Sequence, residues 1–321
     1  MIEPIVRHIS DVLTSGNQTH TNWILDYLAN IVQRPHKKTQ IAILLYGMQG
    51  VGKGIIFEFF RKYVLGEKIT FNTSNPGRDL FDKFGNGFVN KIFVQVDELK
   101  DMQKYSDDIK DIITRPKVCY QGKGKDGSVV DDFTNLVFTT NNARTLPLTC
   151  DNRRFVFFQC TNAHRGDKKY FNELGAHLDN PEVARGFYEH LMSRDLSAYV
   201  NDFQGAGRPI TAYFNEVRRD GIPLLSCFMS KMVVDINFDI IKTNVFTPEA
   251  LYERYVIYYD NNHTKYQEKL PQRNFWMEVA KLPGVTKDRK KTGKVYVFDT
   301  AVIMKDLTDK NHFDADVEDL A

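Results

Sequence analysis

A short apolar segment that runs directly into a glycine-rich loop constrains this chain more than any other feature. Residues 41–46 (IAILLY) are apolar, and Gly47, Gly50, Gly52 and Lys53 follow before a helical pattern begins. Glycine lets the backbone turn tightly and direct its N–H groups at a phosphate. The lysine adds a cation, and the N-terminus of a helix favours the same negative charge. We therefore expect a strand, a phosphate-binding loop and a helix, with ATP as the ligand.

The spacing of this loop fits the P-loop pattern except at one position. A serine or threonine usually follows the lysine, and its hydroxyl contacts Mg²⁺, but this chain has glycine there. Either carboxylates and water hold the metal instead, or the loop is degenerate; the plainest alternative is a glycine-rich turn that binds nothing. The residues expected to contact the nucleotide are Gly47, Gln49, Gly50, Val51, Gly52, Lys53, Gly54 and Ile55.

Composition limits the remaining possibilities. The 321 residues can bury one good core and a second, smaller one. The net charge is only +2, so a nucleic-acid site must come from local basic patches. The four cysteines form no CxxC pair and the histidines are scattered, which indicates a reduced protein without a metal cluster. No apolar run is long enough to span a bilayer and no signal peptide is visible, so we expect a protein that is not secreted and has no membrane contact.

The pattern of apolar residues indicates an α/β fold in four parts. Strand candidates at 41–46, 68–71, 91–96, 135–139 and 154–159 alternate with helical segments, which is typical of a mostly parallel sheet. We expect an N-terminal helical segment at 1–40, a P-loop core at 41–160, a helical region at 161–240 and a winged-helix-like domain at 241–321. In the last part, two helices and a basic hairpin follow one another.

Two further strands deliver polar residues at their ends. The apolar strand 91–96 is followed by Asp97, which would position Mg²⁺, and Glu98, which would polarise an attacking water. The alternative is an acidic pair that caps the next helix. The strand that begins at residue 135 ends beside Asn141, whose amide could sense the terminal phosphate; the alternative there is a turn-forming asparagine.

Basic residues supply the remaining candidates. Arg153 or Arg154 could reach a nucleotide in a neighbouring subunit as an arginine finger, or the two could form a surface pair. A hairpin at 117–130 carries Tyr120, Lys123 and Lys125, an aromatic and two cations suited to single-stranded DNA; the alternative is a plain polar hairpin. In the last part, Lys290 and Lys291 could follow a duplex backbone or simply make the surface soluble.

In this order, the motifs resemble those of superfamily 3 helicases, a viral and phage branch of the AAA+ ATPases. The likeness is to the helicase part of poxvirus-type and phage primase–helicases. Residues 47–54 lie where that family has its Walker A motif, 94–98 where it has Walker B, and 111–130 resemble its B′ motif with a basic hairpin. Residues 139–141 resemble motif C, and 151–155 resemble the arginine-finger segment.

The resemblance implies an AAA+ P-loop core and an ATP-driven DNA helicase of viral or mobile-element replication, with ATP and Mg²⁺ as cofactors. It also implies a homo-oligomer, a hexameric ring, acting on single-stranded or forked DNA. A primase or another replication protein would be its partner, in the cytoplasm or at a replication site of the host cell. The residues left open three alternatives: an AAA+ initiator or loader that binds DNA without unwinding it, a nucleotide kinase, and a winged-helix DNA-binding protein whose loop is inactive.

Overall fold

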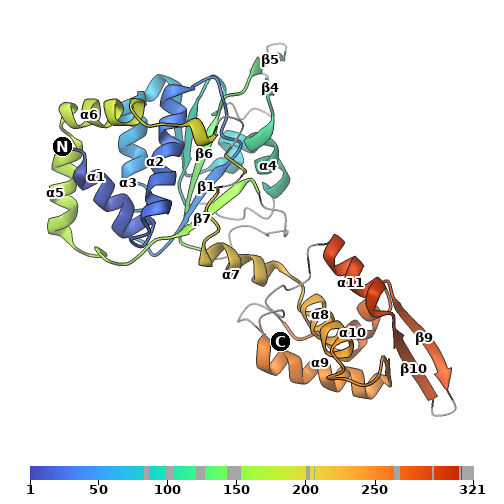
Figure 1. The fold of residues 1–321 in the computed structure, drawn as a ribbon. Helices are drawn as coiled ribbons and strands as arrows, with labels where there is room; N and C mark the ends of the chain where they lie inside the picture. The colour runs from blue at the N-terminus through green and yellow to red at the C-terminus, as the bar shows by residue number, and fades with distance from the viewer. Residues whose placement is uncertain are drawn as a thin grey trace. The chain divides into compact units, whose positions relative to one another are not determined.

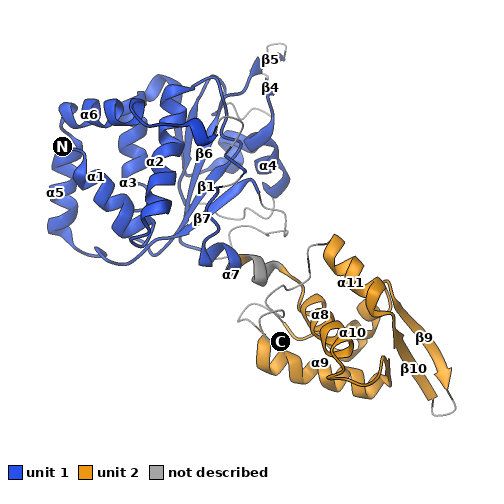
Figure 2. Ribbon diagram, in the orientation of Figure 1, with its two compact units in different colours: residues 1–147, 152–215 blue, residues 148–151, 216–321 orange. Residues whose placement is uncertain are grey.

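The chain forms two compact units in the computed structural model. The first comprises residues 1–147 and 152–215, and the second comprises residues 148–151 and 216–321 (Figure 2). The expected division into four parts is a finer one and stays a prediction. The structure describes residues 1–82, 87–98, 105–120, 127–142, 153–199, 203–205, 207–263, 268–290, 293–310 and 312.

A five-stranded parallel sheet is the centre of unit 1 (Figure 1). Its strand order is β2-β3-β6-β1-β7, and every neighbouring pair is parallel. The sheet confirms the expected α/β fold with a mostly parallel sheet, and all five predicted strands belong to it. The strands are β1 (Ala42–Tyr46), β2 (Thr70–Thr73), β3 (Phe93–Val96), β6 (Asn135–Thr140) and β7 (Phe155–Gln159).

Helices cover the sheet and explain why its strands are continuous apolar runs. In Figure 1, α1, α2, α3, α5 and α6 gather on one face, while α4 lies on the other. Trp23, Leu28 and Phe187 from these helices share one core with Ile43 and Phe158 of the sheet. The α-helices of unit 1 are α1 (Glu3–His8), α2 (Gln18–Gln33), α3 (Ile55–Phe59), α4 (Ser106–Thr114), α5 (Lys168–Leu178) and α6 (Pro181–Met192). A further helix, α7 (Ala212–Gly221), begins in unit 1 and ends in unit 2.

Shorter helical turns extend or connect these elements. Two π-helical turns continue α1 and α3 directly, and side chains of Asn17, Asp167 and Asn180 cap the N-termini of α2, α5 and α6. The turns are Ile9–Leu13, Phe60–Leu65, Glu67–Ile69, Gly77–Phe81 and Ser197–Tyr199.

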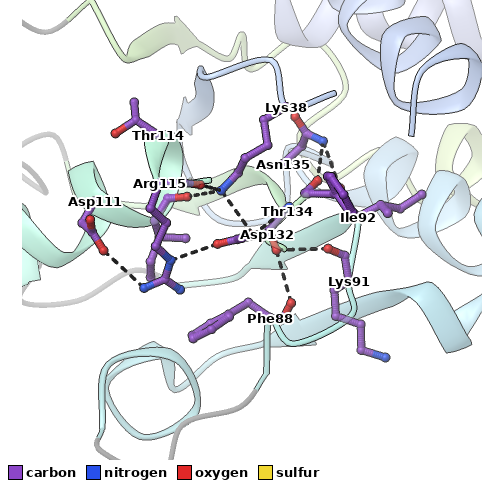
Figure 3. Close-up of polar contacts among 12 residues, drawn as sticks. Lys38, Phe88, Lys91, Ile92, Asp111, Thr114, Arg115, Asp132, Thr134 and Asn135 are labelled. Atoms are coloured by element: carbon purple, nitrogen blue, oxygen red, sulfur yellow. Dashed lines mark hydrogen bonds and ion pairs between the residues drawn. The ribbon is translucent and has the colours of Figure 1, made fainter. Parts of the chain in front are cut away.

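The base of a hairpin is fixed to the sheet by a buried carboxylate. Strands β4 (Lys117–Tyr120) and β5 (Ser128–Asp131) pair antiparallel, and Asp132 follows β5. Its side chain is fully buried and pairs with Lys38 at 3.2 Å and Arg115 at 2.9 Å (Figure 3). Lys38 Nζ also donates to the carbonyl oxygens of Ile112 and Arg115, so it caps the C-terminal end of α4 as well.

Unit 2 has its own core around a small antiparallel sheet of order β8-β10-β9. The rings of Phe228, Tyr255 and Phe275 pack against one another in that core, in T-shaped and tilted arrangements. The side chain of Thr247 caps the N-terminus of α9. A threonine followed by proline and glutamate predicts a helix start of this kind. The elements are α8 (Leu224–Asn237), β8 (Val245–Phe246), α9 (Pro248–Asn262), α10 (Gln272–Val279), β9 (Val285–Lys290), β10 (Gly293–Phe298) and α11 (Thr300–Asp309).

Across the described residues of both units, none of the helices combines the length and the apolar character that crossing a membrane requires.

Candidate functional site

A cavity of about 230 Å³ lies at the carboxyl edge of the parallel sheet in unit 1. The loop after β1 forms one side of it, the residues after β3 form another, and the end of β6 closes it. Because the chain continues from β1 to the far edge of the sheet and returns, the loop after β1 lies where ligands bind in open parallel sheets. The residues that line the cavity are Gln49, Gly50, Gly52, Lys53, Gly54, Asp97, Glu98, Thr139, Thr140 and Asn141.

The structure thus brings most of the predicted nucleotide residues together. Gly50 and Gly52 have φ angles of +82° and +88°, a conformation that favours glycine. Val51 is buried and turns away from the lining, and Ile55 begins α3. At Gly47 the constraint is the space for a side chain and not the backbone conformation, because a Cβ atom there would lie 3.0 Å from the Cβ atom of Cys160.

Lys53 lies folded over the loop. Its ammonium donates to the carbonyl oxygens of Gly47 at 2.7 Å and Met48 at 2.9 Å, and to Asn141 Oδ1 at 2.6 Å. Partial burial lowers the pKa of Lys53, and the negative charges of Glu98 and Asp97 oppose that shift. Through Asn141, Lys53 thus links the loop to the end of β6.

The acidic side of the cavity is organised around Asp97. Gln95 Nε2 donates to both of its carboxylate oxygens, at 3.0 and 3.3 Å, and Thr139 Oγ1 donates to Oδ1 at 3.1 Å. Glu98 follows with a φ angle of +53°, a left-handed conformation that is costly for a residue with a side chain. Such strained residues cluster at functional sites, so the carboxylate pair has the local signature of one.

The side-chain oxygens at this cavity can hold Mg²⁺ only together with the phosphate oxygens of a bound ligand. The described residues contain no group of three or more His, Cys, Asp or Glu side chains that could hold a metal ion by themselves. Mg²⁺ is usually bound through one or two carboxylates plus substrate phosphates and water. Asp97, predicted to hold the metal, and Glu98 supply the two carboxylates, and the loop would supply the phosphates.

His8 and α5 hold the loop from behind, and the sequence analysis missed both. His8 is fully buried; its Nε2 lies 3.0 Å from the carbonyl oxygen of Gly52 and its Nδ1 lies 2.9 Å from the Tyr170 hydroxyl. A Cβ atom at Gly52 would lie 2.8 Å from both His8 Cε1 and Phe171 Cε1. Burial lowers the pKa of His8, so the neutral imidazole donates to Gly52. No spacing in the sequence indicates these contacts.

A second cavity of about 580 Å³ lies on the other side of β1, next to the loop. Cys160, which contacts Gly47, belongs to its lining. Tyr213 in this lining stacks on Tyr46 at the end of β1, with ring centroids 5.0 Å apart. Aromatic and amide side chains therefore surround a space of the size that small ligands occupy. They include His20, Phe158, Asn17, Gln159 and Asn162.

The arginines predicted as fingers lie away from the cavity of their own chain. Arg153 is exposed and Arg154 is half-buried, and both precede β7, at the amino edge of the sheet. The backbone carbonyl of Arg154 accepts from Ala42 at the start of β1, which places it opposite the loop. A role in a neighbouring subunit stays a prediction.

The predicted DNA contacts are described only in part. Lys123, Lys125, Lys291 and the side chain of Tyr120 lie outside the described residues. Lys290 is exposed at the end of β9. The DNA-binding role of all five stays a prediction.

Comparisons with known proteins place the chain near a phage replication enzyme. A model of a family of unknown function, DUF5906, matches residues 45–154. A DNA primase-polymerase of Nitratiruptor phage NrS-1 is 23% identical over 172 residues, which cover 52% of this chain and only 23% of that protein. Apo structures of the NrS-1 C-terminal region share the fold: one has a TM-score of 0.68 and 15% identity over 92% of this chain and 75% of that one. Another has a TM-score of 0.65 and 16% identity over 92% and 74% of the two chains.

These findings correct the main functional prediction. The relative is named a primase-polymerase, so the prediction of an ATP-hydrolysing DNA helicase of superfamily 3 is wrong. The initiator or loader and the nucleotide kinase, the alternatives, gain no support from the same match. What the resemblance did anticipate is a relative from phage DNA replication.

Proposed function

We propose that unit 1 is a nucleoside triphosphate-binding module of an enzyme that acts on DNA in replication, of the primase-polymerase kind. The observation that carries the nucleotide site is the convergence of Lys53, Asp97, Glu98 and Asn141 on one cavity beside a glycine loop. The ends of two neighbouring parallel strands, β3 and β6, and the loop after β1 supply these groups, although the residues are up to 88 positions apart. The similarity to the NrS-1 protein supports the link to DNA synthesis.

Different groups of the chain would contact the phosphates and the metal of a bound triphosphate. Backbone N–H groups of the loop and the ammonium of Lys53 would bind phosphate oxygens. Lys53 would exchange its contacts to Gly47, Met48 and Asn141 for them. Mg²⁺, when bound with the nucleotide, neutralises phosphate charge, and Asp97 and Glu98 would hold it. ATP and Mg²⁺ are the cofactors expected from the sequence, and they stay predictions.

The nucleoside would occupy the second cavity. The 230 Å³ of the first cavity is below the range of about 300–1,000 Å³ that whole small-molecule ligands need. The neighbouring 580 Å³ on the far side of Gly47 offers His20, Phe158 and Tyr213 for stacking. A nucleotide would thus lie across the loop, with its phosphates on the acidic side and its base on the aromatic side.

The finer fold assignment belongs to the same proposal. The position of the loop after the interior strand β1, with β6 and β7 on either side, supports a P-loop core of the AAA+ kind. In unit 2, the order of helix, helix and β-hairpin supports a winged-helix unit. The hexameric ring, the replication partner and the catalytic roles of Glu98, Asn141 and the two arginines stay predictions.

Calorimetric titration of the full chain tests the proposal. We expect ATP or a deoxynucleoside triphosphate to bind in the presence of Mg²⁺ and more weakly in EDTA. Lys53→Ala should weaken binding about 10- to 100-fold, because charged hydrogen bonds contribute about 1.5–3 kcal/mol. Lys169→Ala is the control, since that lysine is exposed on α5. Equal affinities of wild type and Lys53→Ala, or no binding at all, would refute the site.

A further inference from the structure

The space beside the position that departs from the P-loop pattern is occupied by a side chain of strand β3, Gln95. Gly54 has a helical backbone, with φ −94° and ψ −11°, so its conformation suits any residue. A side chain there would instead compete with the present placement of Gln95: a Cβ atom would lie 2.9 Å from Gln95 Nε2 and 3.5 Å from Asp97 Oδ1. The hydroxyl residue usual at this position and the observed placement of Gln95 therefore exclude one another.

Gln95 is an unusual residue for the middle of a parallel sheet. It lies in β3 two positions before Asp97, so both side chains are on the same face of the strand. It is 2% exposed, and its amide N–H group contacts both oxygens of Asp97. Its Oε1 is buried and has no hydrogen-bond partner among the described residues. An unpaired buried acceptor is destabilising, so stability does not explain a glutamine here.

We propose that Gln95 is the positioning residue for Mg²⁺ at this site: it orients the metal ligand Asp97 in a loop that lacks the usual P-loop hydroxyl. With Thr139, it fixes the Asp97 carboxylate in one orientation by three hydrogen bonds. An amide N–H group cannot ligate a cation, so Gln95 acts through Asp97, and position 54 gives the metal no side-chain oxygen. The inference rests on the proposed function, because it concerns the metal that accompanies the nucleotide.

The first test compares wild type with Gln95→Met, which keeps the side-chain length and removes the amide. The affinity for a fluorescent ATP analogue is measured with Mg²⁺ and with EDTA. The ratio of the two affinities is the gain in affinity due to the metal, called the metal gain below. We expect Gln95→Met to reduce that gain about tenfold, as is usual for residues that orient metal ligands. Affinity in EDTA should stay the same, and the thermal midpoint should not fall, because the unpaired Oε1 is gone. A lower midpoint with an unchanged metal gain would indicate a merely structural role and overturn the proposal.

The second test uses the exclusion between the two positions. Gly54→Ser alone should lose metal gain, because its Cβ atom displaces the Gln95 amide. Gly54→Ser combined with Gln95→Ala should recover most of that gain, since the serine hydroxyl then has room beside Asp97. A double variant no better than the worse single variant would overturn the proposal.

The proposed function and this inference fail in different ways. If the wild type binds no nucleotide under either condition, the proposed function falls, and this inference falls with it. If the wild type binds nucleotide equally well with Mg²⁺ and with EDTA, the nucleotide site stands, but the metal role of Asp97, Glu98 and Gln95 is overturned.

Discussion

Neutralising Asp132 would show how strongly the buried carboxylate holds the base of the β4–β5 hairpin (Figure 3). Its oxygens accept from Lys38, Arg115 and the backbone N–H of Thr134, and its side chain is 0% exposed. Asp132→Asn keeps the volume and leaves two cations facing a neutral amide. Breaking a buried pair in this way costs about 3–5 kcal/mol. In a domain of about 150–250 residues, 1 kcal/mol is about 2–4 °C, so we expect the thermal midpoint of unit 1 to fall by about 6–20 °C.

The adjacent residue provides a matched control. Asp131 pairs with Lys117 at 3.3 Å, but the two side chains are 60% and 65% exposed. Exposed pairs contribute about 0–1 kcal/mol, so Asp131→Asn should leave the midpoint almost unchanged. Scanning calorimetry of the two variants measures the difference directly. A midpoint for Asp132→Asn as high as that of Asp131→Asn would refute the reasoning.

The pH dependence of the Asp132→Asn variant gives an independent check. Burial lowers the pKa of Lys38, and the charge of Asp132 opposes that shift. Without the carboxylate, the folded-state pKa of Lys38 falls further below its ordinary value near 10.4. Between these two values the unfolded chain binds more protons than the folded one, so stability rises with pH. We therefore expect the variant to regain part of its deficit, relative to wild type, between pH 7 and about pH 9.5 in denaturant titrations.

Three further predictions concern the glycine loop after β1 and the β9–β10 hairpin of unit 2. Burial lowers the pKa of His8 below its ordinary value near 6.5, so the stability of unit 1 should fall as pH drops below about 6.5; His8→Gln should reduce that fall in urea titrations. Gly52→Ala should lower the thermal midpoint more than Gly50→Ala, because both have positive φ but only Gly52 is crowded; equal losses would contradict this packing. Lys290→Ala should reduce the salt dependence of DNA binding by about one unit of slope, whereas an unchanged slope would exclude a phosphate contact.

The sheet was predictable because its strands, apart from the edge strand β2, are buried on both faces. Parallel strands covered by helices are continuous apolar runs, so a stretch such as 41–46 or 155–159 stands out from the sequence alone. The polar residues that end these strands were predictable for the same reason: parallel strands end at one edge. Asp97 and Asn141 therefore lie in one cavity as expected. The observed strand order and register contradict none of these predictions from local pattern.

The contacts that shape the site from behind were not predictable from local pattern. His8 and Tyr170 are 162 positions apart and meet only because α1 and α5 pack against each other. Gln95, in contrast, could have been noticed in the sequence. A primary amide inside an otherwise apolar strand indicates a buried side chain that needs a hydrogen-bond partner. The function could not be predicted either, because similar loops serve many reactions and the site alone does not name the substrate.

The glycines of the loop illustrate why a motif match and a working site are separate matters. Gly50 has no neighbour near its Cβ position, so only its φ angle requires glycine. At Gly47 and Gly54 a Cβ atom would instead crowd a neighbouring side chain, Cys160 and Gln95 respectively. A sequence pattern records that each position is glycine but not which neighbour excludes a side chain. Gly54 therefore looks like a defect in the pattern, whereas in the structure it is the position that makes room for the amide beside Asp97.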